Sequence, residues 1–275
     1  MNDIKARIKS VSGTMQITKA MELVAISKLR RAKESVERSR PYYNLIGDAI
    51  KTVVGSSEVG SSVWFSPKTE GKTLFVVVAG DRGLAGGYNS NVFKLTDALL
   101  SDGAVFLPVG KKSVDHYKHA GSEIFSDAFV YVADVSVGDA FAMADLICRA
   151  YASGEFSRVE LVYTRFISMM SQSPVHEQLL PLTAKDGSKD VGDPIWDGEP
   201  EEILDRIVPQ YVGGVLYSSI CEAIASELSA RRMSMNAANK NASEMIDSLM
   251  LGYNRARQAV ITQEITEIVS GAEAL

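Results

Sequence analysis

Cysteine and histidine are scarce in this sequence of 275 residues, which contains two cysteines and three histidines. Cys148 and Cys221 lie among apolar-periodic residues without the short spacing of a metal site, so we expect two buried side chains in a reducing compartment. His116 and His119 lack the spacing of a zinc-protease motif, and we expect them on a solvated helix face. No G-x-S-x-G elbow or cysteine-nucleophile motif occurs. The sequence therefore predicts no catalytic residue, no metal site and no cofactor.

Long apolar runs are also missing. Spanning a bilayer requires about 20 consecutive apolar residues, and no stretch of this sequence reaches that length. The N-terminal residues MNDIKARIKSV lack the apolar core of a signal peptide. From the residues alone we therefore expect a cytosolic protein.

The sequence has no net positive charge. It contains 29 lysines and arginines and 34 acidic residues, which gives a net charge of −5. This balance argues against general nucleic-acid binding. The charge is uneven, however, because the first forty residues are mostly basic and the segment Lys185–Asp205 is strongly acidic. Such asymmetry predicts a basic element that meets an acidic partner.

The first forty residues have an apolar repeat of alternating four and three residues, which is typical of a coiled-coil helix. No proline interrupts it before Pro41, so we expect a rod of about 60 Å. Ile17, Met21 and Val24 form a neighbouring stripe that we expect to cover a polar gap at Glu22. The repeat consists of Ile4, Ile8, Val11, Met15, Thr18, Glu22, Ala25, Leu29, Ala32 and Val36.

The C-terminal part has the same kind of periodicity after Pro209 and predicts a second rod of about 85 Å or more. Two such rods are expected to pair as an antiparallel coiled coil, with the longer C-terminal helix protruding. Its polar middle contains Arg231, Arg232, Met233 and Met235 among small residues, without aromatics. This composition favours a loose protein contact over a nucleic-acid patch.

Between the rods, strand-like and helix-like segments alternate, which indicates an α/β sheet that is mostly parallel. We expect strands at residues 73–79, 104–110, 128–134 and 158–166, and helices at 92–100, 111–121 and 138–154. The predicted fold class is α/β, a long antiparallel coiled coil of N- and C-terminal helices with an inserted, mostly parallel α/β domain. The expected boundaries are 1–57 for the N-terminal helix, 58–205 for the inserted domain and 206–275 for the C-terminal helix.

A glycine-rich turn, GDRGLAGGYN at Gly80–Asn89, follows the first expected strand and precedes a helix, which is a common arrangement for binding phosphate. A Walker loop requires Gly-Lys-Ser/Thr after its glycines, but Tyr88 and Asn89 stand there, and the dinucleotide spacing also fails. The pattern favours a structural turn. A nucleotide-binding α/β enzyme that uses the Gly80–Gly87 turn remains an alternative, as does a free-standing coiled-coil scaffold.

Four blocks of this sequence, in order, resemble the gamma subunit of F-type ATP synthases of the bacterial type. The third is the pattern Phe166, Ser168, Gln172 and Pro174 with LLPL. The most specific is YNRARQAVITQEITEIVSGAEAL at residues 253–275. The first two are QITKAMELVAISKLRRAK at 16–33 and GDRGLAGGYNSNV at 80–92.

The resemblance implies a central rotor shaft that does no bond chemistry. In that family the coiled coil stands inside a ring of three alpha and three beta subunits. The α/β domain lies below, with the epsilon subunit and the membrane-embedded c ring. The shaft couples ion flow through the c ring to conformational change at the beta subunits during ATP synthesis or hydrolysis. The implied location is the cytoplasmic face of the bacterial cell membrane, as a peripheral protein, with nucleotide bound only by partner chains.

The resemblance also implies roles for individual residues. Met21 matches a position facing an acidic loop of the beta subunit, and nearby cations that could meet this loop are Lys19, Lys28, Arg30 and Arg31. Polar contacts with a beta-subunit loop are implied for Arg257, Gln258, Thr262 and Glu264, and an apolar bearing for Ile265, Ile268 and Val269.

Overall fold

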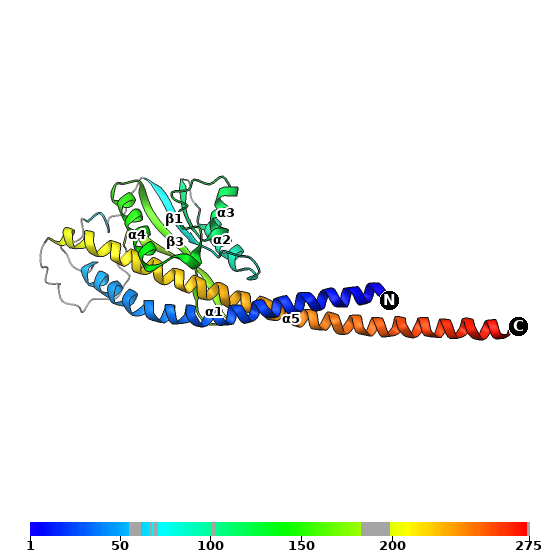
Figure 1. Ribbon diagram of the computed structural model, residues 1–275. Helices are drawn as coiled ribbons and strands as arrows, with labels where there is room; N and C mark the ends of the chain where they lie inside the picture. Colours follow the sequence, from blue (N-terminus) through cyan, green and yellow to red (C-terminus); the bar gives the residue numbers. More distant parts are fainter. Residues whose placement is uncertain (55–61, 66–67, 69–70, 101–102, 183–198, 274–275) are drawn as a thin grey trace. The chain divides into compact units, whose positions relative to one another are not determined.

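The computed structural model describes residues 1–54, 62–65, 68, 71–100, 103–182 and 199–273 (Figure 1). The chain divides into two compact units. The helix unit consists of Met1–Ile26 and Arg231–Leu275, and the sheet unit of Ser27–Ala230. The elements in chain order are α1 (Asn2–Val54), β1 (Lys72–Val78), α2 (Tyr88–Leu99), β2 (Ala104–Val109), α3 (Lys111–His119), the 3-10 helix η2 (Val132–Asp134), α4 (Val137–Ala152), β3 (Phe156–Phe166), β4 (Gln172–Leu180) and α5 (Pro200–Glu273).

The sheet has the strand order β2-β1-β3-β4. Strand β1 pairs in parallel with both neighbours, so that Val76 lies opposite Leu107 of β2 and Leu161 of β3. Strand β4 is antiparallel to β3. The expected mostly parallel sheet is confirmed, and helices lie on both of its faces, as is typical of parallel strands.

Successive residues of β1 point to opposite faces of the sheet, because the side-chain period of a strand is two. Leu74, Val76 and Val78 pack with residues of α4 and α5 in the main core. Phe75 and Val77 pack on the other face with residues of α2 and α3. Figure 1 shows α4 on one side of β1 and β3, and α2 and α3 on the other.

Both long helices continue through a proline. Helix α1 passes Pro41 and ends at Val54, and α5 begins at Pro200 and passes Pro209. An interior proline costs a backbone hydrogen bond. In α1 the buried side chains of Val36 and Ile50 on either side of it supply packing that offsets this cost. Of the expected domain boundaries, 57/58 lies outside the described residues, and 205/206 lies inside α5.

The expected strand at 128–134 is wrong. This segment forms no strand, and it ends in η2. The carbonyl of Phe129 accepts a hydrogen bond from Gly110 N, but the amides of Val132 and Ala133 donate to the carboxylate of Asp81 instead of to a strand. The side chain of Asp81 therefore bends the chain away from the sheet after one contact.

Strand β4 was not predicted. It carries Pro174 and mostly half-buried side chains, which weaken the strand signal. It is an edge strand, and the edge of a sheet is where proline is tolerated.

In each unit α1 and α5 pack together, running antiparallel. In the sheet unit, Leu29, Ala32 and Val36 of α1 form a buried cluster with Ala225 and Leu228 of α5, among others. In the helix unit, Thr18 contacts Asn239, and Glu22 contacts Asn236 and Asn239. The antiparallel pairing expected from the apolar repeats is confirmed.

Candidate functional site: partner-contact surfaces of the helix pair

The turn at Gly80–Asn89 is held by hydrogen bonds within the sheet unit. The carboxylate of Asp81 accepts from the backbone amides of Lys111 at 3.1 Å, Val132 at 2.9 Å and Ala133 at 3.2 Å. The side-chain oxygen of Asn89 accepts from Gly80 N at 2.8 Å. The carboxylate of Asp81 thus accepts hydrogen bonds from three of the backbone amides at this edge of the sheet.

The same turn packs closely against α5. The Tyr88 hydroxyl is buried and donates to the carbonyl of Ala223 at 3.0 Å. A Cβ atom on Gly80 would lie 2.7 Å from the carboxyl carbon of Glu227, so a larger residue there would force the end of this buried side chain to shift. Leu84 and Gly86 adopt positive φ values of 64° and 59°, which the reversal of the chain requires. These contacts give the glycines a structural role.

Both cysteines and one of the three histidines are packed among other side chains. The ring of His116 stacks on Phe93 with centroids 4.0 Å apart, so only His119 lies on the exposed helix face that was expected for both. Cys148 and Cys221 are free and buried, as expected, and burial raises the pKa of the Cys148 thiol to about 12. Among the residues that the structure describes, no group of three or more potential ligands is placed to hold a metal ion.

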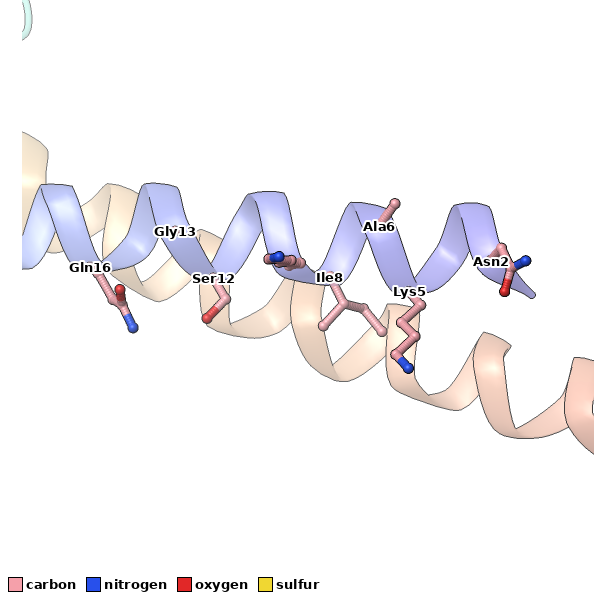
Figure 2. Close-up of a pocket in the computed structure, with 8 residues that line it drawn as sticks. Asn2, Lys5, Ala6, Ile8, Ser12, Gly13 and Gln16 are labelled. Atoms are coloured by element: carbon pink, nitrogen blue, oxygen red, sulfur yellow. The ribbon is translucent and has the colours of Figure 1, made fainter.

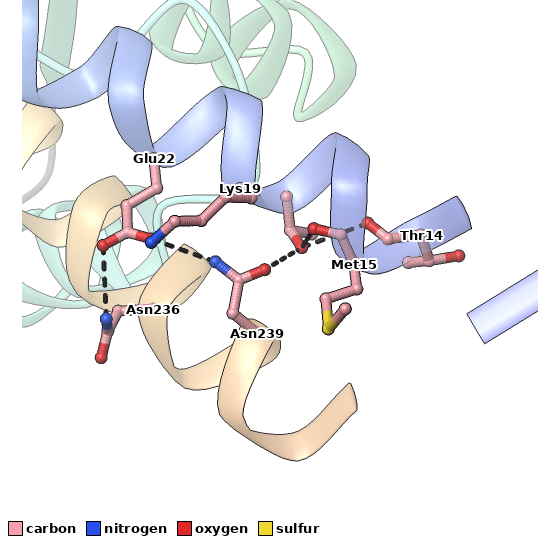
Figure 3. Close-up of polar contacts among 7 residues, drawn as sticks. Thr14, Met15, Lys19, Glu22, Asn236 and Asn239 are labelled. Atoms are coloured by element: carbon pink, nitrogen blue, oxygen red, sulfur yellow. Dashed lines mark hydrogen bonds and ion pairs between the residues drawn. The ribbon is translucent and has the colours of Figure 1, made fainter. Parts of the chain in front are cut away.

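Glu22 lies inside the helix pair, and only 5% of its surface is exposed (Figure 3). Its carboxylate accepts from Lys19 Nζ at 3.1 Å, Asn239 Nδ2 at 3.0 Å and Asn236 Nδ2 at 3.3 Å. The hydrogen bond from Lys19 holds the pKa of Glu22 below its ordinary value, with help from both asparagines and against the effect of burial. The carboxylate is therefore charged and satisfied at neutral pH.

The expected covering stripe beside Glu22 is wrong. Ile17 and Val24 are 64% and 56% exposed, and Met21 is half-buried. Leu23 is also 58% exposed, which leaves apolar side chains on the outside of α1. Asn236 and Asn239 of α5 donate hydrogen bonds to Glu22 directly. The stripe therefore does not cover Glu22 and lies on the outer surface of α1.

The cations implied in partner contact lie on the exposed side of α1. Lys19 belongs to the helix unit and, although paired with Glu22, has a side chain that is 58% exposed. Lys28, Arg30 and Arg31 belong to the sheet unit and are exposed around the buried Leu29. Within each unit, the structure places these cations where a partner can reach them.

The far part of α5 is exposed on every side. Arg257, Gln258, Thr262 and Glu264 are all exposed, and the Thr262 hydroxyl donates only to the carbonyl of Gln258, at 2.9 Å. The apolar residues Ile265, Ile268 and Val269 are 56%, 71% and 50% exposed. A helix that exposes this much apolar surface is incomplete without a partner.

Sequence comparison decides the family. A family sequence profile described as ATP synthase matches residues 1–275. The ATP synthase gamma chain of Ruminococcus albus is 44% identical over 281 residues, covering 99% of this chain and 97% of that protein. The chain belongs to the family of ATP synthase gamma chains, the central stalk subunits of F-type ATP synthase. A gamma chain of Acetobacterium woodii, described as sodium ion specific, is 38% identical and covers 100% of this chain and 98% of that protein.

Chains in solved structures of mitochondrial ATP synthases share the fold. A chain of the Euglena gracilis mitochondrial ATP synthase, in a structure of OSCP, F1 and the c ring, aligns with a TM-score of 0.68 at 18% identity. It covers 99% of this chain and 93% of that one. A chain of the Tetrahymena thermophila mitochondrial ATP synthase central stalk and c ring aligns with a TM-score of 0.63 at 24% identity and covers 81% of this chain and 99% of that one.

The polar middle of α5 in this gamma chain family member has an inner and an outer side. Met235 is buried, whereas the neighbouring Met233 is 45% exposed. In the part of the chain that the structure describes, no helix is long and apolar enough to cross a membrane.

An open hollow of about 760 Å³ runs along the start of α1 (Figure 2). Its lining includes Lys5, Lys9 and Ile8, and every lining residue comes from the first sixteen of the chain. A hollow lined by a single helix, with two lysines and no acidic side chain, lacks polar groups that converge from several elements as in a ligand site.

Proposed function

We propose that this chain is the rotor shaft of a bacterial F-type ATP synthase, which couples ion flow through a membrane ring to conformational change at catalytic beta subunits. The observation that carries the proposal is the far part of α5, where a family-typical sequence forms a helix with exposed apolar side chains. Family membership names the complex, and the exposed helix supplies the surface that must be covered in it.

The mechanism follows from symmetry. A single helix pair cannot present the same face to three equivalent sites at once. Each beta subunit therefore meets different contacts and is stabilised in a different conformation, and rotation passes these conformations around the ring. This is coupling by differential contact with alternative states.

The proposed contacts with the beta subunits lie on two parts of the chain. Near the start, Met21 of the helix unit faces an acidic loop, as does the exposed cation Lys19. The exposed cations of the sheet unit that could also meet this loop are Lys28, Arg30 and Arg31. Exposed charge pairs of this kind steer and align partners more than they add affinity. On the far part of α5, contacts are made by Arg257, Gln258, Thr262 and Glu264.

The apolar residues Ile265, Ile268 and Val269 are proposed as a bearing within an apolar collar of the surrounding ring. Their exposure of at least half in the chain itself supports this assignment. Apolar contact is non-directional, which suits a surface that must slide past three equivalent positions.

The chain is proposed to be non-catalytic, because Asp81 and α5 occupy the surroundings of the glycine turn that an enzyme would use. Its partners are three alpha subunits, three beta subunits, the epsilon subunit and the c ring, and nucleotide is bound only by partner chains. It binds no nucleic acid and does not insert into the membrane. Its location is the cytoplasmic face of the bacterial cell membrane, where it takes part in ion transport as a peripheral protein.

Native mass spectrometry of the tagged protein, purified gently from its own cells, tests the proposal. We expect one copy of this chain with three copies each of two nucleotide-binding partners. Recovery of the chain alone or as a homodimer with nucleotide attached would overturn the rotor assignment and favour the enzyme.

The contact residues need their own test in the assembled complex. Met21→Lys is expected to leave ATP hydrolysis largely intact and to lower proton pumping per ATP, because a new cation at the acidic loop disturbs coupling. Replacing Arg257 and Gln258 together by alanine is expected to impair assembly or turnover. Unchanged pumping per ATP, or unchanged growth on a respiratory substrate, would remove the respective residue from the contact surface.

A further inference from the structure

A layer of polar side chains crosses the helix unit at Thr18 and Glu22, two positions of the apolar repeat of α1. The polar layer consists of Thr18 and Glu22 of α1 and Asn236 and Asn239 of α5 (Figure 3). Asn239 is its centre. Its Nδ2 donates to Glu22, and its Oδ1 lies 2.5 Å from Oγ1 of Thr18.

The polar layer lies at the limit of full burial in the helix unit. Ala25, Glu22 and Met235 are 1%, 5% and 4% exposed. Among the described residues nearer the start of α1 or the end of α5 within this unit, none is buried to this degree. From the polar layer outward, the described side chains of both helices in this unit are at most half-buried, as Ile8 and Val11 are.

Apolar layers and hydrogen-bonded layers resist sliding differently. Apolar contacts are non-directional, so one helix can move along the other with a modest change in buried area. A hydrogen bond requires a donor–acceptor distance near 2.7–3.2 Å and is lost within a fraction of a helical turn. Single polar residues in a coiled-coil core are known to set alignment at a cost in stability.

We propose that Thr18, Glu22, Asn236 and Asn239 act as a clamp that fixes the axial alignment of α1 on α5 and resists sliding of the helices when the pair is twisted. The alignment follows from the contacts alone. Resistance to twisting rests on the rotor function proposed above, because only a rotating shaft carries torque along this pair.

The clamp gives a role to a charged residue at a core position. Replacing the polar layer by leucines would bury more apolar surface, and such replacements are often neutral or stabilising. It would also remove the hydrogen bonds that join Thr18 and Glu22 of α1 to Asn236 and Asn239 of α5. A shaft that is stable but slides would transmit less torque for the same rotation of its base.

Spin-label distances in the full chain test the alignment. Ser10 lies twelve residues outward from Glu22 along α1, and Ser270 lies 34 residues outward from Asn236 along α5, so their separation runs mainly along the helix axis and reports sliding. Both serines are exposed and can be replaced by labelled cysteines. Cys148 and Cys221 are buried and stay in place, and the chain without added cysteines measures their labelling. We expect one narrow distance distribution for the chain with the intact layer.

The decisive variant is E22L/N239L, which removes all three hydrogen bonds of the polar layer between α1 and α5. Thr18 keeps its bonds to the carbonyls of Thr14 and Met15, and the exposed Asn236 can bond to water. We expect an unchanged or higher melting temperature but a second distance component, displaced by about 5 Å, which is one helical turn. E22Q keeps a hydrogen-bonding side chain and should stay narrow. E244L is the matched control, because it replaces an exposed glutamate of α5 in the same unit by leucine.

A single unchanged distance in E22L/N239L would overturn the clamp, and so would equal broadening in E244L. Loss of any defined distance would also overturn it, because the layer would then be needed for pairing itself. In the assembled complex, the torsional stiffness of the shaft should fall in E22L/N239L and remain in E244L. If the chain assembles with no such ring, the distance experiment still decides the alignment, so the two proposals fail separately.

Discussion

Replacing Asp81 by alanine is predicted to destabilise the sheet unit. It is not expected to change the response of the protein to nucleotide. The Asp81 carboxylate accepts three backbone hydrogen bonds, two at Oδ1 from Lys111 and Val132 and one at Oδ2 from Ala133. These bonds join the turn after β1 to the start of α3 and to η2. Alanine leaves all three amides without this acceptor.

The magnitude follows from which amides water can reach. The Val132 hydrogen bond is partly buried, and a hydrogen bond to a charged group contributes about 1.5–3 kcal/mol. The Lys111 and Ala133 bonds are exposed, so water replaces most of each, leaving about 0.5 kcal/mol apiece. The expected loss is roughly 2–4 kcal/mol, which lowers the melting temperature of a unit of this size by about 4–16 °C.

Asp81→Asn gives a graded comparison. Its amide oxygen can still accept from Lys111 and Val132, so it loses mainly the charge and the Ala133 bond, and we expect about half of the effect. Asp97→Asn, an exposed change on α2, should leave the melting temperature within about 1 °C of the parent.

Thermal unfolding followed by circular dichroism, with and without millimolar ATP, measures both effects. A ligand that binds the folded state raises the melting temperature by mass action. The structural role predicts no ATP-dependent rise in the parent or in Asp81→Ala. The reasoning is refuted if Asp81→Ala melts with the parent, or if ATP stabilises the parent and not the variant.

Three further outcomes are expected. Gly80→Ala places a Cβ 2.7 Å from the Glu227 carboxyl carbon and should cost about 1–3 kcal/mol in thermal unfolding, whereas Gly83→Ala, with open space around its Cβ, should not. The pKa of Glu22 is lowered in the folded state, so the charged carboxylate stabilises the fold above its ordinary pKa of 4.5, and this stabilisation is lost as the pH falls below that value. The difference in unfolding free energy between the parent and Glu22→Gln should therefore close in acid. A difference that stays constant with pH would contradict this reasoning. Ile268→Asp should change the unfolding free energy of the isolated chain by less than about 0.5 kcal/mol, since Ile268 is 71% exposed, yet reduce ATP synthesis in the complex; equal synthesis would remove it from the bearing.

The architecture could be predicted because its signals are local and repeated. The repeats in α1 and α5 are long, and β1 is a continuous apolar run of the kind that parallel strands require. Residues 128–134 show why other elements could not be predicted. Their alternation indicates a strand, but a distant carboxylate, Asp81, takes the amides that would have paired. The sequence did not predict β4 for the opposite reason. Its edge position tolerates a proline, and this proline weakens the local strand signal.

The candidate site shows a similar division. The absence of a Walker sequence predicted a structural turn, and the hydrogen bonds of Asp81 and Tyr88 give that turn its physical cause. Glu22 was interpreted as a gap in an apolar stripe, because periodicity assigns a face but not a partner. Only the structure shows that Asn236 and Asn239 reach it from α5. Two asparagines three residues apart on α5, Asn236 and Asn239, lie on one side of the helix, and this spacing is the signal that could have identified the polar layer.

The far part of α5 also bears on how a shaft distinguishes three equivalent sites. Ile261, Ile265 and Ile268 follow the helical spacing of four and three and therefore lie along one side of the helix, while Thr262 and Glu264 lie away from it. A shaft that was apolar all round would meet each surrounding subunit alike and could not favour different conformations. In the proposed ring, a helix with this isoleucine stripe on one side would offer each position a different contact at any moment. The asymmetry that the proposed function requires is therefore already present in the sequence of a single helix.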